Sequence, residues 1–159
     1  MAWTNSKIFR AYVADIIGNT TAMDLNTDAS IKVALYNNTT TPDQNATSAL
    51  SAYNAATSQW VTANEVVDAT NWVAGGRALS GATIDSATSG VVFFDATDLA
   101  GGGTVTISNA YGCLVYDDTI TTPVADQGIC FNYFGGAQSV TAGTFTIVWH
   151  ANGIFRFTL

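Results

Sequence analysis

The sequence offers few of the side chains from which enzymes build reaction centres. It contains a single histidine, His150, and a single glutamate, Glu65. One histidine excludes a metal site with several histidine ligands and handicaps a histidine-based triad. Because His150 falls beside the turn of a predicted terminal hairpin, we interpret it as structural. Glu65 lies in a segment without clear periodicity. We therefore predict no catalytic residue, no cofactor and no metal ion.

Positive charge is scarce as well. Lysine and arginine together number 5 against 12 acidic residues, which gives a net charge of −7 at pH 7. The five cations form no run in the sequence; they are Lys7, Arg10, Lys32, Arg77 and Arg156. Binding to a phosphate backbone requires clustered cations, so we expect no nucleic acid partner. An acidic chain is also repelled by anionic membranes, and we expect no membrane partner.

The sequence also lacks long apolar runs, and no apolar stretch approaches the ~20 residues that a membrane-spanning helix requires. Residues 1–19 interleave positive charges with apolar side chains, and Asp15 interrupts them, unlike a secretory signal. We therefore expect synthesis and folding in a cytoplasm.

Cys113 and Cys130 lie in apolar, strand-like segments, where we expect buried thiols; a disulfide would need an oxidising compartment.

What the sequence does contain suits strands and turns. Charged residues make up only 11% of the chain, and much of the polar remainder is threonine, serine, asparagine and glycine. These residue types favour strands and turns over exposed helices. A neutral polar surface of this kind is common in proteins that are packed in an assembly or work outside a cell.

The C-terminal residues 144–159 show the clearest strand pattern. With residues 151–153 as a hairpin loop and Gly153 at positive φ, six large apolar side chains fall on one face, and Val148 and Ile154 fall on the other. The predicted cross-strand pairs are Trp149–Phe155, Ile147–Phe157 and Phe145–Leu159. A slip of one residue would mix the two faces, so the alternation specifies this register strongly.

Further elements follow from periodicity and turn residues. Residues 6–17 predict an amphipathic helix with Ser6 as N-cap and an apolar stripe at Phe9, Tyr12, Val13 and Ile16. Residues 38–60 predict a long polar loop or insertion with a helical turn near 46–53. The predicted strands are 30–37, a pair at 77–84 and 90–95, residues 104–108, and a pair at 110–117 and 127–134. We predict a mainly β fold, an antiparallel β-sandwich or barrel-like single domain over 1–159, with one N-terminal amphipathic helix.

Two groups of side chains are candidates for a binding site. Asp117 and Asp118, with Asp126 nearby in sequence, could gather around a cation, but their spacing matches no known loop, and a solvated turn is the simpler interpretation. Trp60 and Trp72 could stack on a sugar ring. Burial in a core or an interface is the alternative for these tryptophans, because tryptophan is enriched at protein contacts.

Two stretches resemble a known group of proteins. Residues 111–159, from YGCLVYDD to GIFRFTL, and residues 34–54, ALYNNTTTPDQNATSALSAYN, are similar to small virion proteins of tailed bacteriophages that are encoded among the head structural genes. The resemblance implies a capsid decoration (cement) protein or minor head protein, made in the host bacterial cytoplasm. It carries no catalytic motif.

From this we expect a structural virion protein on the capsid exterior. It would bind the major capsid protein, bridge neighbouring subunits and form a homo-oligomer, with a trimer favoured. The alternatives are a tail or fibre component that binds a host-surface glycan and, less favoured, an enzyme on a β scaffold. The expected contact elements are the N-terminal helix or anchor, 1–18, and the loop 38–60. The expected partner-binding residues are Ile8, Phe9, Tyr12, Trp60 and Trp72.

Overall fold

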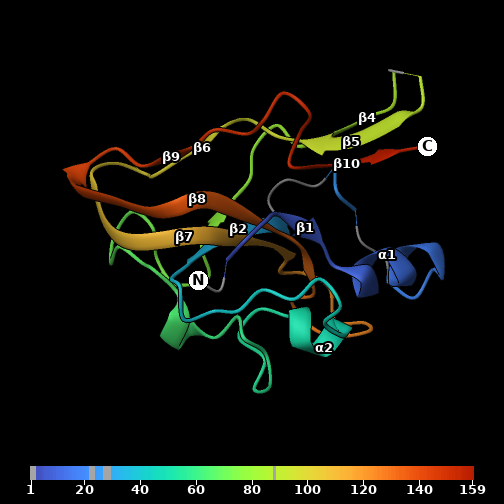
Figure 1. The fold of residues 1–159 in the computed structure, drawn as a ribbon, viewed down its shortest axis with the longest axis horizontal. Coiled ribbons are helices and arrows are strands. Elements are labelled where there is room, and N and C mark those ends of the chain that lie inside the picture. The colour runs from blue at the N-terminus through green and yellow to red at the C-terminus, as the bar shows by residue number, and fades with distance from the viewer. Residues whose placement is uncertain (1–2, 22–23, 27–29, 88) are drawn as a thin grey trace.

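The fold is mainly β, as predicted, with antiparallel sheets and two short α-helices. The computed structural model describes residues 3–21, 24–26, 30–87 and 89–159, so the first two residues of the expected N-terminal anchor lie outside the described residues. Figure 1 shows two β layers, with helix α2 below them and helix α1 at one end.

A five-stranded sheet forms the central layer, with strand order β1-β8-β7-β2-β3. Its strands are β1 (Lys7–Ile8), β2 (Ile31–Tyr36), β3 (Arg77–Ala78), β7 (Val105–Asp117) and β8 (Gly128–Gly143). The register places Cys113 opposite Asn132 and Val115 opposite Cys130, which confirms the predicted pairing of 110–117 with 127–134. Both cysteines are buried free thiols, as expected.

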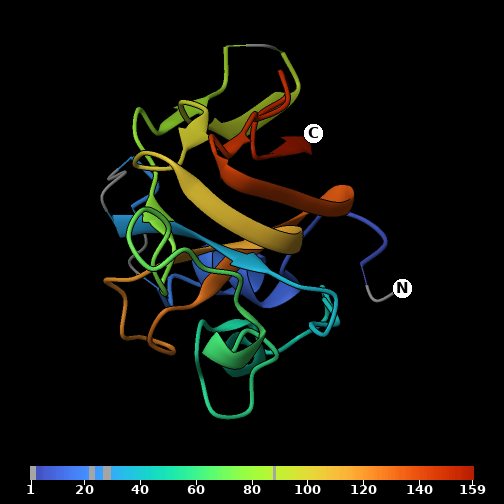
Figure 2. The ribbon, with the colours of Figure 1, turned by 90° about the vertical axis from the view of Figure 1, so that its left-hand side faces the viewer.

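The second layer consists of a three-stranded sheet, β10-β5-β4, and a two-stranded ribbon, β6-β9. In Figures 1 and 2 both lie above the central sheet. The strands are β4 (Thr83–Asp85), β5 (Val91–Asp95), β6 (Leu99–Ala100), β9 (Thr146–Ile147) and β10 (Phe155–Thr158). The predicted pairing of 77–84 with 90–95 is confirmed for Thr83–Asp85 only, because Arg77–Ala78 pairs with β2.

The predicted terminal hairpin is wrong in its pairing. Ile147 pairs with Leu99, and Phe155 pairs with Phe94, so residues 144–149 and 155–158 join different sheets. The predicted turn is present, with Gly153 at φ +80° and its N–H donating to the His150 carbonyl at 2.7 Å. Residues 145–149 and 155–158 alternate in exposure as expected, because alternation fixes the face of a strand but not the strand beside it. The prediction is wrong at two positions: Leu159 is 88% exposed, and Ile154, expected on the opposite face, is buried.

The N-terminal helix is shorter than predicted. Helix α1 spans Arg10–Ile17, while Lys7–Ile8 pairs with Phe131 and Cys130 as β1. Ser6 is therefore not the N-cap, and its hydroxyl accepts the Tyr133 N–H at 2.9 Å.

Helix α2 (Ser48–Ser51) confirms the helical turn expected near 46–53. A 3-10 helix follows at Thr62–Asn64. Among the described residues no helix combines the length and apolar character needed to cross a bilayer.

An aromatic cluster fills the layer beneath the central sheet. The Trp60 ring meets the rings of Trp3, Phe9 and Tyr36 edge to face, at centroid distances of 5.8, 5.9 and 5.1 Å. All four side chains are buried. Trp3 lies against the backbone of Gly112 on β7, where a Cβ atom would stand 2.3 Å from its ring. The N-terminal segment and the loop 38–60 are therefore both part of the core.

Alanine in place of Gly112 tests this packing. Its Cβ would stand 2.3 Å from the Trp3 ring and 2.4 Å from the Asn132 carbonyl oxygen. Since neither a buried ring nor a strand backbone moves freely, we expect the free energy of unfolding to fall by about 2–3 kcal/mol in a urea titration. The matched control is Gly103→Ala, whose Cβ meets only the Asn71 side chain, at 3.2 Å or more. We expect it to change stability by less than about 0.5 kcal/mol, and equal effects of the two would contradict the packing.

Candidate functional site

A continuous groove runs along one open edge between the two β layers. Three cavities of about 600, 170 and 340 Å³ share lining residues and so adjoin one another. The first two share Tyr133, Phe134, Ile147 and Val148, and the last two share Ser6, Asn132 and Ile154. We call this the edge groove; it is lined by residues 6–8, 130, 132–134, 138–140, 144–150 and 153–157.

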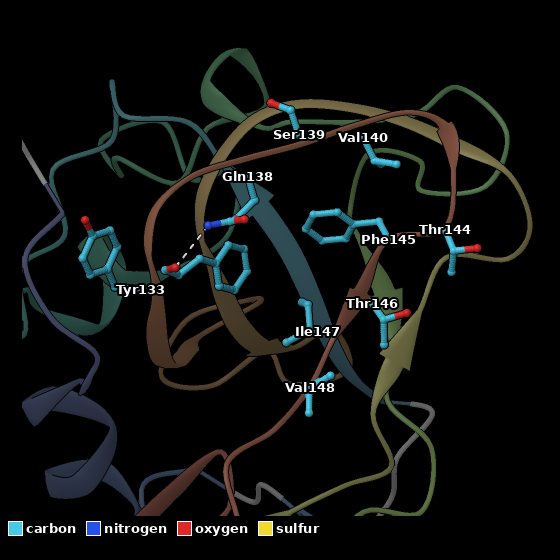
Figure 3. Close-up of a pocket in the computed structure, with 10 residues that line it drawn as sticks. Tyr133, Gln138, Ser139, Val140, Thr144, Phe145, Thr146, Ile147 and Val148 are labelled. Atoms are coloured by element: carbon cyan, nitrogen blue, oxygen red, sulfur yellow. Dashed lines mark hydrogen bonds between the residues drawn. The ribbon is translucent and has the colours of Figure 1, made fainter.

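The irregular pairing of β7 with β8 shapes the wide end of the groove. The register shifts at four places along this pair, and such bulges bend and twist a strand. Gly135 and Gly136 take φ values of +80° and +151°, which glycine adopts without strain. Figure 3 shows Phe145 and Ile147 pointing from the opposite segment towards β8, while Thr144 and Thr146 point away.

The walls of the edge groove combine aromatic and apolar side chains with polar ones. Phe145 lies 6.3 Å from Phe134 between ring centroids, and Trp149 lines the middle of the groove. Val148 is 72% exposed, which is unusual for an apolar side chain in a strand-like segment. The indole Nε1 of Trp149 is buried and has no hydrogen-bond acceptor within the described residues. A ligand in the groove would meet aromatic and apolar side chains, whereas this buried N–H is not accessible to it.

The charge of the groove is opposite to that of the chain. Lys7 and Arg156 line its narrow end, whereas no acidic residue is among the described residues that line the groove. Within the described residues no carboxylate forms an ion pair with Lys7 or Arg156, and Arg156 donates only to the Asn152 side chain, at 3.0 Å. The groove is therefore a positive region on a protein with net charge −7.

Most of the residues expected to bind a partner are buried. Phe9, Tyr12, Trp60 and Trp72 are each at most 1% exposed, so their side chains offer no surface to a partner or a sugar. For these four the expectation of a contact surface is wrong, because the apolar stripe and the tryptophans fill the protein's own core. Ile8 is half-buried and lines the narrow end of the groove.

The N-terminal segment is likewise not a separable anchor. Trp3 is fully buried, and its indole N–H donates to the Asn37 carbonyl at 3.0 Å. The Arg10 N–H donates to the Gln44 carbonyl at 2.9 Å, which ties α1 to the loop 38–60. Removal of residues 1–18 would therefore take away core side chains as well as surface.

The acidic residues near the end of β7 have structural partners. Asp117 is 2% exposed and accepts both the N–H and the hydroxyl of Thr119, so the solvated-turn interpretation is wrong for this residue. Asp118 forms an ion pair with Lys32. Burial, and then the charge of Asp118, raise the pKa of Asp126. Among the residues that the structure describes, no three histidine, cysteine, aspartate or glutamate side chains gather in a way that could hold a metal ion.

Glu65 anchors a turn rather than facing a ligand. Its carboxylate accepts the Tyr53 hydroxyl at 2.8 Å and the Gly75 N–H at 2.9 Å. Tyr53 stacks on Tyr116 with 4.7 Å between ring centroids, and the Tyr116 hydroxyl donates to the Gly75 carbonyl. Burial raises the pKa of Glu65, although these hydrogen bonds partly oppose the rise.

Sequence reasoning missed most of the groove because its two walls are far apart in the chain. The pairing of β9 with β6 and of β10 with β5 separates the terminal strands and opens the space between them and β8. The weak available signal was the pair of adjacent glycines at 135–136 inside an otherwise regular strand pattern.

Comparisons with models of protein families, with curated proteins and with solved structures found no match.

The Glu65 network predicts a specific pH dependence. The pKa of Glu65 is higher in the folded protein than in the unfolded chain, where it is about 4.3. The protonated carboxyl therefore stabilises the folded state below about pH 4.3, and this stabilisation is lost as the pH rises through the pKa of the folded state. Glu65→Gln removes the titrating group. We therefore expect the free energy of unfolding of the wild type, minus that of E65Q, to decrease as pH rises above about 4. Urea titrations at several pH values measure this, and a difference independent of pH would contradict the assignment.

Proposed function

We propose that this protein is a structural virion protein that binds the outside of a bacteriophage capsid and stabilises it by bridging neighbouring subunits. The resemblance of residues 34–54 and 111–159 to small phage head proteins led to this proposal. The observation that carries it is the edge groove, which exposes aromatic and apolar side chains among polar ones and has Lys7 and Arg156 at its narrow end. Contiguous exposed apolar surface with a polar rim marks interaction sites.

The way in which the acidic residues are used supports binding rather than catalysis. Glu65 holds the turn at Gly75, Asp117 holds Thr119, and Asp15 accepts from Ser48 and Gln127 at 2.7 Å. Each of these carboxylates is engaged in holding loops together. The most exposed large apolar side chains are instead Leu159, Ile17 and Val148, of which Val148 lines the groove.

The net charge favours the outer face of the capsid. A chain with net charge −7 is repelled by packaged DNA, whereas the positive groove would be free to meet the shell. The proposed partner is the major capsid protein. Several copies around a local threefold axis would give the trimer, and measurement of the mass in solution tests for it.

A tail or fibre component that binds a host glycan is the second candidate. The aromatic side chains in the walls of the groove are the feature that favours it. Trp60 and Trp72 do not contribute, because both are buried. Location of the chain by electron cryomicroscopy of the assembled phage particle distinguishes head from tail.

Val148→Asp tests the groove as the contact surface. The side chain is 72% exposed, so an aspartate should leave the fold intact, yet burial of its carboxylate against a partner is costly. We expect binding to capsids that lack this protein to weaken about tenfold or more, which corresponds to ~1.4 kcal/mol.

Val73→Asp is the matched control, because Val73 is 48% exposed and lies outside the groove. Binding is measured by co-sedimentation with the capsids, and folding by circular dichroism. If both variants bind as the wild type does, the groove is not the contact surface. If the wild type itself is absent from the particle, the proposed function fails.

A further inference from the structure

We propose that the narrow end of the edge groove receives an extended, acidic peptide segment of the partner, which adds as a strand to the free edge of β10. The inference rests on the proposed function and names the chemistry of what the groove binds. Three features of the narrow end, lined by Ser6, Lys7, Ile8 and residues 154–157, support it: its open strand edges, its charge and its apolar wall.

Two strand edges face this end of the groove. β10 is the last strand of its sheet, and β1 is the last strand of the central sheet. Leu159 donates its N–H to the Gly90 carbonyl, and hydrogen-bonded pairs alternate along an antiparallel ladder. The backbone groups of Arg156 and Thr158 therefore point away from β5, towards the open side. They form a short row of donors and acceptors that an added strand would satisfy.

The charges at this end select an acidic segment. Lys7 and Arg156 are both exposed, and within the described residues neither is matched by a carboxylate of this chain. A glutamate or aspartate beside Arg156 would form a charge-assisted bond there. A basic segment would instead meet like charge, so the same two residues provide the discrimination.

The side chains of β10 fit an alternating segment. Phe155 and Phe157 are half-buried on one face, and Arg156 and Thr158 are exposed on the other. An added strand would place every second residue over the two phenylalanine rings and the residues between on the face of Arg156. Alternating apolar and acidic residues are therefore the expected pattern. A strand fits better than a glycan, because backbone pairing uses the open edge and a sugar ring does not.

The test uses a synthetic peptide of about eight residues in which valine and glutamate alternate, with hydrogen exchange and fluorescence anisotropy as readouts. We expect saturable binding and slower exchange at the N–H groups of Arg156 and Thr158. Three matched probes are the same peptide with lysine for glutamate, the same peptide N-methylated at alternate residues, and a hyaluronan oligosaccharide. We expect each of the three to bind at least about tenfold more weakly.

Charge reversal in the protein provides the second arm. Lys7→Glu together with Arg156→Glu should weaken peptide binding about tenfold or more, and capsid binding with it. Arg10→Glu is the control, because Arg10 is an exposed cation on α1 outside the groove, and it should bind as the wild type does.

The two proposals fail differently. The strand proposal is overturned if the glutamate peptide does not bind, or if the lysine peptide binds equally well. It is also overturned if hyaluronan binds more strongly and the N–H groups of Arg156 and Thr158 are not protected from exchange. If the wild type nevertheless occupies capsids, the proposed function stands. If the peptide binds as described but the chain is absent from virions, the strand site stands and the capsid role falls.

Discussion

The burial of one aromatic cluster beneath the central sheet is the interaction on which the rest of the structure depends. Trp60 comes from the loop 38–60, Trp3 and Phe9 come from the N-terminal segment, and Tyr36 comes from β2. Aromatic side chains of this size dominate the energetics of a core, and edge-to-face pairs add specific geometry. The cluster therefore joins the N-terminal segment and the loop 38–60 to a strand of the central sheet. It also fixes where β1 runs, and β1 forms one wall of the narrow end of the groove.

The upper layer depends on a different constraint, the bulged pairing of β7 with β8. A regular ladder of this length would twist evenly along its whole length. The register shifts and the left-handed residues Asn109 and Ala142 bend the pair instead, so that the end of β8 curls towards residues 144–148. The edge groove is the space between that curl and the terminal strands. A rigid core below and a bent ribbon above give an open surface whose walls do not need to rearrange to accept a ligand.

Alternation located several of the strands, because it reports burial directly, but Lys7–Ile8 was predicted as helix and pairs as β1, and Leu99–Ala100 was not predicted as a strand. The strand at 30–37 and the pairing of 110–117 with 127–134 were found in this way, and the long loop with its helical turn followed from composition. The neighbours of the terminal strands were not predictable, since Ile147 satisfies the same alternation opposite Leu99 as opposite Phe157. Buried tryptophans and interface tryptophans have the same sequence signal, so Trp60 and Trp72 were misplaced. The groove combines segments distant in sequence, and no local pattern reports that proximity.

Open strand edges can pair with other chains, and this hazard explains the positions of the cations. An uncovered edge invites pairing with any other strand, and proteins place charged side chains on such edges to prevent it. Arg156 on β10 and Lys7 on β1 meet this requirement, because two copies brought together at these edges would oppose like charges. The same charges do not repel an acidic strand. These two side chains thus serve two purposes in a chain that has few charged residues. They disfavour pairing between copies of the chain, and they leave the edge open to a partner strand of the opposite charge. The acid-free lining of the groove is what makes this discrimination effective, because a carboxylate of the chain itself would neutralise the pair.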